Sequence, residues 1–434
     1  MVLTRKPLIS LSIVLLCLLW GLSFSLYANE SSLSRSEYKR IQQVQSLQVE
    51  ARWQEARKVT RKYLEAEPRP LLSAMLWRSL AQIELQEARY KAALPALKKA
   101  WQLKQLPEKE QLSLQGIMAQ LMLQQDELKQ GILLFEAWLD QTPKDKHQAR
   151  HYLSLAQAYS LLEKWSKALP HVKKAISLSD RVPTNWYQMQ VGLHSRLKQW
   201  PQAVSVQKIV VARKANQMAS WRQLALLQYQ VSHKGKPHHQ NKTRHKHHKK
   251  KRREVSEAAL ATLRIAYERQ LFEKISDYQL LSQWLSVNNL PYQAAQVLEE
   301  GVMTQSQYQA PNKVFLKQQR RLAQLWIRAK ALPKAEAVLQ QLATIQPDPK
   351  LLQQLAQLQI RQQQWQKAES SLKQLLALSP KNYGDILLLH GITLLQLEKR
   401  IKASEQFQLA LKEDSSQQGA KQWLNYIAAT EHSS

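Results

Sequence analysis

One small residue returns along this chain at nearly constant spacing. It is alanine at nine places and glycine at one, and an aromatic residue stands three positions before it at the five clearest places. Neighbouring members are 33 to 41 residues apart, except across one gap of 56. A repeat of this length is typical of a helix–turn–helix unit and predicts a chain of stacked helical hairpins. The ten residues are Ala56, Ala93, Gly131, Ala168, Ala203, Ala259, Ala294, Ala335, Ala368 and Ala403.

Two further positions keep the same register when the small residue is numbered 20 in each repeat. Two helices that cross closely need small residues at the crossing, and bulky apolar residues fill the space beside it. Position 8 is small in seven repeats, although Val44 stands there in the first, and position 24 is bulky and apolar in eight. The small residues are Ala81, Ala119, Ala156, Ala225, Ala323, Ala356 and Gly391, and the bulky ones are Leu97, Phe135, Val172, Leu263, Leu298, Leu339, Leu372 and Phe407.

This pattern resembles the tetratricopeptide repeat over roughly residues 37–414. Proline at position 32 of four repeats adds to the resemblance, because proline ends a helix. The resemblance implies an all-α fold, a right-handed α-solenoid of about ten helix–turn–helix repeats that binds other proteins and carries out no chemistry. Residues 415–430 place Trp423, Leu424 and Ile427 on one face. We expect them to form a helix that caps the last repeat.

No catalytic motif accompanies the repeats. The sequence has no phosphate-binding G-x-x-x-x-G-K-[ST] or G-x-G-x-x-G loop, no H-E-x-x-H and no G-x-S-x-G. Histidines outside one basic segment are not spaced as metal ligands, and His390 falls at a packing position. The sequence therefore predicts a protein that is not an enzyme and that needs no cofactor.

An apolar run covers residues 8–26, after Arg5 and Lys6 and just before Ala28. A charged start, an apolar middle and a small residue outline a secretory signal, which predicts export and cleavage after Ala28, so that residues 1–28 are removed. The run is also near the length that spans a bilayer, so an uncleaved inner-membrane anchor is the alternative.

The gap of 56 residues holds an insert, residues 233–253, with ten Lys and Arg, six His and no Asp or Glu. Such a segment cannot bury apolar area, and we expect a disordered loop between the two helices of the sixth repeat. It is either a tolerated solvated insertion or a site for anionic lipid, glycan, another acidic polymer or, unless the chain is exported, nucleic acid. The polyanion-binding candidates are Lys249, Lys250, Lys251, Arg252 and Arg253. A divalent metal is a weaker alternative, because neighbouring cations repel it; its candidates are His238, His239, His247 and His248.

The rest of the chain is basic as well. Its formal charge is +30, and +18 remains without the ten cations of the insert and without Arg5 and Lys6. This excess favours an anionic partner or surface. An envelope protein held to anionic lipid or glycan by its basic loop and basic face is therefore a second functional hypothesis.

A row of polar residues marks the predicted binding face. Position 9 is glutamine in seven repeats, and first helices of tetratricopeptide repeats line the concave face. Amide and guanidinium groups four residues apart on one helix face can bind a peptide backbone and its carboxylates. The alternative explanation for the repeated glutamine is that the chain is rich in glutamine and that this position tolerates polar residues. The predicted binding residues are Gln45, Gln82, Gln120, Gln157, Gln283, Gln324 and Gln357, with Arg320, Arg328, Gln353 and Arg361 beside them.

Two short segments resemble a narrower group. They are Asn185-Trp186-Tyr187-x-Met189 and Leu290-Pro291-Tyr292-x-Ala294-Ala295-x-Val297-Leu298-Glu299-x-Gly301. They look like segments of the exported tetratricopeptide proteins that accompany TonB–ExbB–ExbD systems of Gram-negative bacteria. This resemblance implies a periplasmic accessory of TonB-dependent transport, with components of the TonB complex as its partners.

Overall fold

The computed structural model describes residues 33–234, 255–306 and 313–431, and every regular element in these ranges is helical. The predicted signal or anchor of residues 1–28 lies outside these described ranges, and so do residues 235–253 of the basic insert. No helix in the described ranges combines the length and the apolar character needed to cross a membrane.

The chain divides into two compact units, Met1–Val210 and Val211–Ser434, which we call the N-terminal and C-terminal units. The N-terminal unit contains α2 (Arg35–Val49), α3 (Trp53–Glu65), α4 (Pro70–Gln86), α5 (Tyr90–Gln102), α6 (Glu108–Gln124), α7 (Leu128–Gln141), the short helix η2 (Lys144–Lys146), α8 (Ala149–Leu161), α9 (Trp165–Ser177) and α10 (Thr184–Arg196). Helix α11 (Trp200–Arg213) runs across the boundary.

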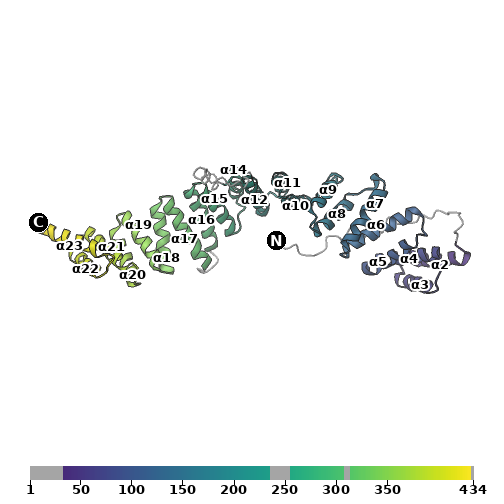
Figure 1. Cartoon of the computed structure of the whole chain (residues 1–434), viewed down its shortest axis with the longest axis horizontal. Helices are drawn as coiled ribbons and strands as arrows, with labels where there is room; N and C mark the ends of the chain where they lie inside the picture. The colour runs from purple at the N-terminus through teal and green to yellow at the C-terminus, as the bar shows by residue number, and fades with distance from the viewer. Residues whose placement is uncertain (1–32, 235–254, 307–312, 432–434) are drawn as a thin grey trace. The chain divides into compact units, whose positions relative to one another are not determined.

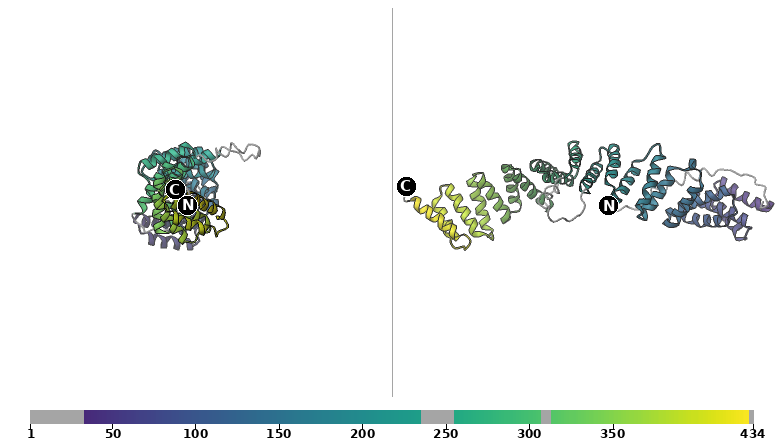
Figure 2. Two further views of the ribbon diagram at one scale, coloured as in Figure 1. Left: turned by 90° about the vertical axis from the view of Figure 1, so that its left-hand side faces the viewer. Right: turned by 45° about the horizontal axis from the view of Figure 1, so that its top comes forward.

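The C-terminal unit contains α12 (Met218–Lys234), α14 (Glu257–Glu268), α15 (Ile275–Val287), α16 (Pro291–Ser306), α17 (Lys313–Arg328), α18 (Leu332–Ile345), α19 (Pro349–Arg361), α20 (Trp365–Ala377), α21 (Tyr383–Gln396), α22 (Arg400–Ala410) and α23 (Gln417–Glu431). Within this unit consecutive helices lie side by side in chain order (Figure 1, Figure 2). Helices α12 and α14 pack together although the basic insert separates them in the sequence.

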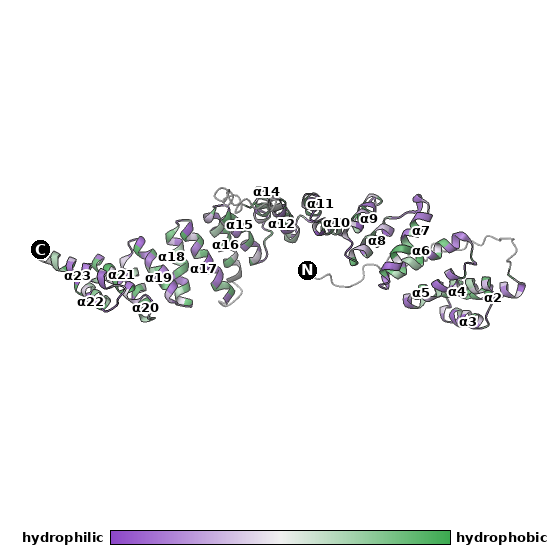
Figure 3. Ribbon diagram, viewed as in Figure 1, coloured by the Kyte–Doolittle hydropathy of each residue, from purple (hydrophilic) through white to green (hydrophobic). Residues whose placement is uncertain are grey.

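Within the units, second helices also pack against the first helix of the next repeat, as α16 does against α17 and α18 against α19. Helix α23 covers α22 and α21 at the end of the chain. The prediction of an all-α, tetratricopeptide-type solenoid with a C-terminal capping helix is confirmed. Most helices carry both polar and apolar residues, as expected when each helix packs against its neighbours on some sides and meets solvent on the others (Figure 3).

The recurring small residues lie where the helices cross. All nine alanines at position 20 have no exposed surface, and Gly131 is buried with them. A Cβ atom on Gly131 would lie 2.8 Å from Leu123 Cδ2, and one on Gly391 would collide with the ring of Phe407. The bulky residues at position 24 are buried beside these crossings. The sequence register therefore corresponds directly to the packing.

In the nine repeats whose inner turn lies in the described ranges, that turn contains a left-handed residue that is not glycine. In nine repeats the residue at position 15 has φ between 54° and 64°. In the fourth repeat the Glu163 N–H donates to the Ser160 carbonyl at 3.1 Å, and the Lys164 N–H donates to the Tyr159 carbonyl at 2.9 Å. These two bonds form a Schellman motif, which satisfies carbonyls at the end of the first helix. The nine residues are Ala51, Ala88, Asp126, Glu163, Lys198, Asn289, Lys330, Gln363 and Glu398.

Glycine should stabilise such a turn. We expect Glu163→Gly to raise the free energy of unfolding by about 1 kcal/mol, because a side chain disfavours the left-handed region. Urea denaturation followed by circular dichroism measures the change. Ser166→Gly, at an exposed position inside α9, is the control and should lower stability by about 0.5 kcal/mol. Destabilisation by both substitutions would contradict this account of the turn.

Ion pairs join neighbouring repeats in the C-terminal unit. The buried Glu369 of α20 accepts a hydrogen bond from Lys373 of the same helix at 2.7 Å. It accepts a second one, at 2.6 Å, from Lys399, which directly precedes α22 in the next repeat. Glu336 of α18 pairs in the same way with Lys367 of α20 at 3.1 Å. Burial alone would raise the pKa of Glu369, but the two lysine hydrogen bonds outweigh it and hold the pKa at about 2.

Acid should therefore loosen this junction. A carboxylate whose folded pKa lies below its ordinary value near 4.5 stabilises the fold above that pH, and the contribution disappears as the pH falls towards 2. Glu369→Gln should lower the free energy of unfolding by up to about 3 kcal/mol at pH 7 and by much less near pH 3. Urea titrations across this range test it, with the exposed Glu405→Gln as control. A pH-independent deficit would contradict the assignment.

Candidate protein-binding face

The predicted row of glutamines divides between the two units. In the N-terminal unit Gln120 is buried, and Gln45, Gln82 and Gln157 are half-buried. Gln120 is buried by the packing around its own helix α6, which has no fully exposed side chain from residue 111 to residue 125 and contacts α5, α7 and α8. These glutamines are therefore poorly accessible to a partner.

The C-terminal unit leaves the same position open. Gln283 of α15, Gln324 of α17 and Gln357 of α19 are all exposed, and no described side chain bonds to them. They stand at equivalent places on successive first helices. The accessible part of the predicted face therefore comprises α15, α17 and α19.

Helices α17 and α19 form the charged centre of this face. Neither helix contains Asp or Glu. Positions 2, 5, 9 and 13 lie within about 80° of one another around a helix, so they point to one side. Seven of these eight residues are exposed, and Gln353 is half-buried. We call this set the α17–α19 face: Lys317, Arg320, Gln324 and Arg328 on α17, and Lys350, Gln353, Gln357 and Arg361 on α19.

Two of the predicted arginines already have partners within the fold. Arg320 pairs with Asp348 at 2.6 Å, and Asp348 also caps α19 by accepting the Leu351 N–H at 3.0 Å. Arg328 donates to the Ser286 hydroxyl, at the end of α15, at 2.8 Å. Arg320 and Arg328 therefore help to hold neighbouring first helices in place.

Three other cations of the face have no such role. Arg361, Lys317 and Lys350 are exposed, and none has a hydrogen bond or ion pair within the described residues. The two lysines were missed by the sequence reasoning, which followed glutamine and arginine alone. Their place at position 2 of two acid-free first helices was the available signal.

Apolar residues flank the charged centre at equivalent positions. Leu226, at position 9 of α12, is 42% exposed, and Val287, at position 13 of α15, is 37% exposed. On the other side, Leu388 and Ile392 of α21 are half-buried against the cluster that α22 and α23 form with α21. An extended ligand along these first helices would meet the exposed apolar side chains of α12 and α15, then cations and amides, then what these two side chains of α21 leave exposed.

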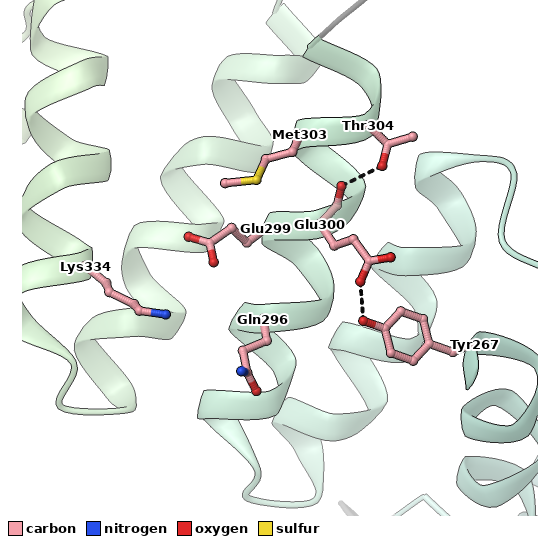
Figure 4. Close-up of a pocket in the computed structure, with 7 residues that line it drawn as sticks. All are labelled: Tyr267, Gln296, Glu299, Glu300, Met303, Thr304 and Lys334. Carbon is pink, nitrogen blue, oxygen red and sulfur yellow. Dashed lines mark hydrogen bonds between the residues drawn. The ribbon is translucent and has the colours of Figure 1, made fainter. Parts of the chain in front are cut away.

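A shallow pocket lies among α14, α16 and α18, on the side of the second helices. Its volume is about 420 Å³, and Figure 4 shows Glu300 between Tyr267 and Thr304. The Tyr267 hydroxyl donates to Glu300, and burial raises the pKa of this tyrosine. The Lys334 ammonium lies 4.4 Å from the centre of the Trp326 ring. The lining contains no His, Ser or Cys, and its Glu300 is bonded to Tyr267.

The described histidines are packing residues. His390 is 4% exposed, its Nδ1 lies 3.1 Å from Gln406 Oε1, and burial lowers its pKa. Burial likewise lowers the pKa of His151 to about 4. Across the described ranges, no three His, Cys, Asp or Glu residues gather as metal ligands. The weak metal candidates His238, His239, His247 and His248 lie outside those ranges, as do the polyanion candidates Lys249, Lys250, Lys251, Arg252 and Arg253.

Solved structures that resemble the chain include several repeat proteins. The C-terminal part of a TPR repeat-containing protein from Cytophaga hutchinsonii is 12% identical, with a TM-score of 0.41 over 64% of this chain and 98% of that one. A tetratricopeptide repeat protein from Parabacteroides merdae is 12% identical, with a TM-score of 0.33 over 68% and 100%. MamA from Desulfovibrio magneticus is 16% identical, with a TM-score of 0.33 over 43% and 99%.

The sequence comparisons give no further relatives. No protein-family model matches the chain, and no curated protein matches it.

Proposed function

We propose that this chain is a non-enzymatic scaffold that binds a protein partner on the α17–α19 face. The observation that carries the proposal is the repetition of cations and amides at positions 2, 5, 9 and 13 of two adjacent, acid-free first helices. Exposed glutamine amides can bond to a peptide backbone, and lysine and arginine can bond to carboxylates. The ligand that fits is an extended acidic segment with apolar residues at its ends.

The internal bonds of the face favour preorganised recognition. Arg320 and Arg328 are held by Asp348 and Ser286, so the rows on α15, α17 and α19 keep a fixed spacing. Lys317, Lys350 and Arg361 remain available for the ligand. A rigid row of this kind lowers the ordering cost of binding, since only the ligand has to become extended.

Reversing the three available charges tests the binding role. The triple variant Lys317→Glu, Lys350→Glu, Arg361→Glu should weaken binding of a synthetic Asp/Glu-rich peptide with leucine at both ends by more than tenfold, because each charge-assisted bond contributes about 1.5–3 kcal/mol. Fluorescence polarisation of the labelled peptide measures the affinity. Circular dichroism should be unchanged, since none of the three side chains bonds to another residue that the structure describes.

The matched control changes the net charge equally in the same unit. Lys381→Glu, Lys402→Glu, Lys421→Glu alters three exposed lysines away from the α17–α19 face, and it should retain most of the affinity. Equal loss in both variants would show attraction by net charge alone. Retained affinity in the first variant would refute the proposed face.

The cellular setting is part of the proposal. The signal-like residues 1–28 and the resemblance of residues 185–189 and 290–301 support a periplasmic accessory of TonB-dependent transport, with components of the TonB complex as partners. Loss of the chain should then reduce TonB-dependent uptake, and a C-terminal alkaline phosphatase fusion should be active only with residues 1–28 present. An inactive fusion refutes export. Normal uptake in the deletion strain, with an active fusion, refutes the TonB role but leaves the scaffold intact.

A further inference from the structure

The second helices of the N-terminal unit carry exposed cations on one side. Helices α5, α9 and α11 contain no Asp or Glu at all. Apart from Arg213 at the end of α11, the exposed Lys and Arg on the five second helices occupy positions 18, 19, 22, 25 and 26, which fall within an arc of about 120° around a helix. We call this set the basic second-helix face: Lys58, Arg61, Lys62, Lys91, Lys99, Lys129, Lys167, Lys173, Lys174 and Lys208.

Most of these cations have no partner in the fold. Arg61 lies 3.5 Å from Glu84, Lys99 stacks on Trp77 and Lys167 faces Tyr159. The other seven have no hydrogen bond, ion pair or ring contact within the described residues. Two of the four carboxylates on these helices are engaged within the fold: Glu55 pairs with Arg52, and Glu136 accepts the Tyr159 hydroxyl at 2.5 Å.

Two large apolar side chains stand on the same arc. Leu133, at position 22 of α7, is 69% exposed, and Ile209, at position 26 of α11, is 40% exposed. Cations beside exposed apolar residues suit an interface where charge meets headgroups and apolar groups enter the layer below. The aromatic side chains of these five fully described helices are all buried or half-buried, so none is free to stack on nucleic acid bases.

We infer that the basic second-helix face of the N-terminal unit is a docking surface for an anionic lipid bilayer. The lysines of α3, α5, α9 and α11 contact headgroups, and Leu133 and Ile209 enter the interface. This surface lies on other helices than the α17–α19 face and is independent of protein binding there.

Flotation of the full-length chain with lipid vesicles tests the inference. Binding should be strong to vesicles that mix phosphatidylcholine with phosphatidylglycerol, weak to phosphatidylcholine alone, and reduced by salt. Each Lys or Arg near an anionic surface raises the partition roughly fivefold, so Lys91→Glu, Lys173→Glu, Lys174→Glu should lower it at least about a hundredfold. The control triple Lys381→Glu, Lys402→Glu, Lys421→Glu should lower it much less.

A single substitution separates a bilayer from a soluble polyanion. Leu133→Gln should weaken binding to the anionic vesicles several-fold while leaving binding to heparin unchanged, since only a bilayer offers an apolar layer. Equal binding to both kinds of vesicle, equal loss in the two triple variants, or no effect of the α5 and α9 reversals would overturn the inference. A Leu133→Gln protein that binds vesicles as the wild type does would also overturn it. Circular dichroism of every variant confirms that it is folded.

Discussion

The close crossing of helices at small buried residues is the constraint on which the rest of the structure depends. Two backbones can approach only where side chains are absent or consist of one methyl group, and the fully buried alanines at positions 8 and 20 provide these places. At Gly391 even a methyl group would collide with Phe407. An added methylene in such packing costs about 1–3 kcal/mol, which is a large share of a domain's stability. The crossings thus fix the rotation of each helix about its axis.

Once that rotation is fixed, the exposed arc of every helix is fixed as well. Positions 2, 5, 9 and 13 of α17 and α19 face outward together because position 8 of the same helices, Ala323 and Ala356, faces inward. In the N-terminal unit the second helices show the same effect, because their positions 18, 22, 25 and 26 face outward and carry the basic second-helix face. Register alone does not decide accessibility, however, since Gln120 and Gln324 share position 9 and only Gln324 is exposed. Gln120 is buried because α5, α7 and α8 pack around its helix, α6.

The helix crossings could be predicted from the sequence because alanine or glycine recurs there at a nearly fixed spacing. The sequence could not predict which residue of the turn is left-handed, because in the nine described turns that position is filled by Ala, Asp, Glu, Lys, Asn and Gln and never by glycine. The turn is imposed by the packed hairpin and its Schellman bonds rather than by local preference. The candidate face was identified from the sequence only in part. Its residues were found from the period, but the burial of Gln120 and the Arg320–Asp348 pair depend on contacts between repeats.

The distribution of charge follows from the same stacking. The chain has 33 acidic residues against 63 Lys and Arg, and many of the acids that the structure describes join one repeat to the next. Glu84, Asp277, Glu336 and Glu369 are buried at such junctions with cations from neighbouring helices. A buried carboxylate without its cation would be costly, so each of these pairs couples the stability of neighbouring repeats. With many carboxylates placed at junctions, the surplus cations are left on outward arcs. The basic character of this protein is therefore concentrated on defined faces, where an anionic ligand or surface meets charges that the fold does not use.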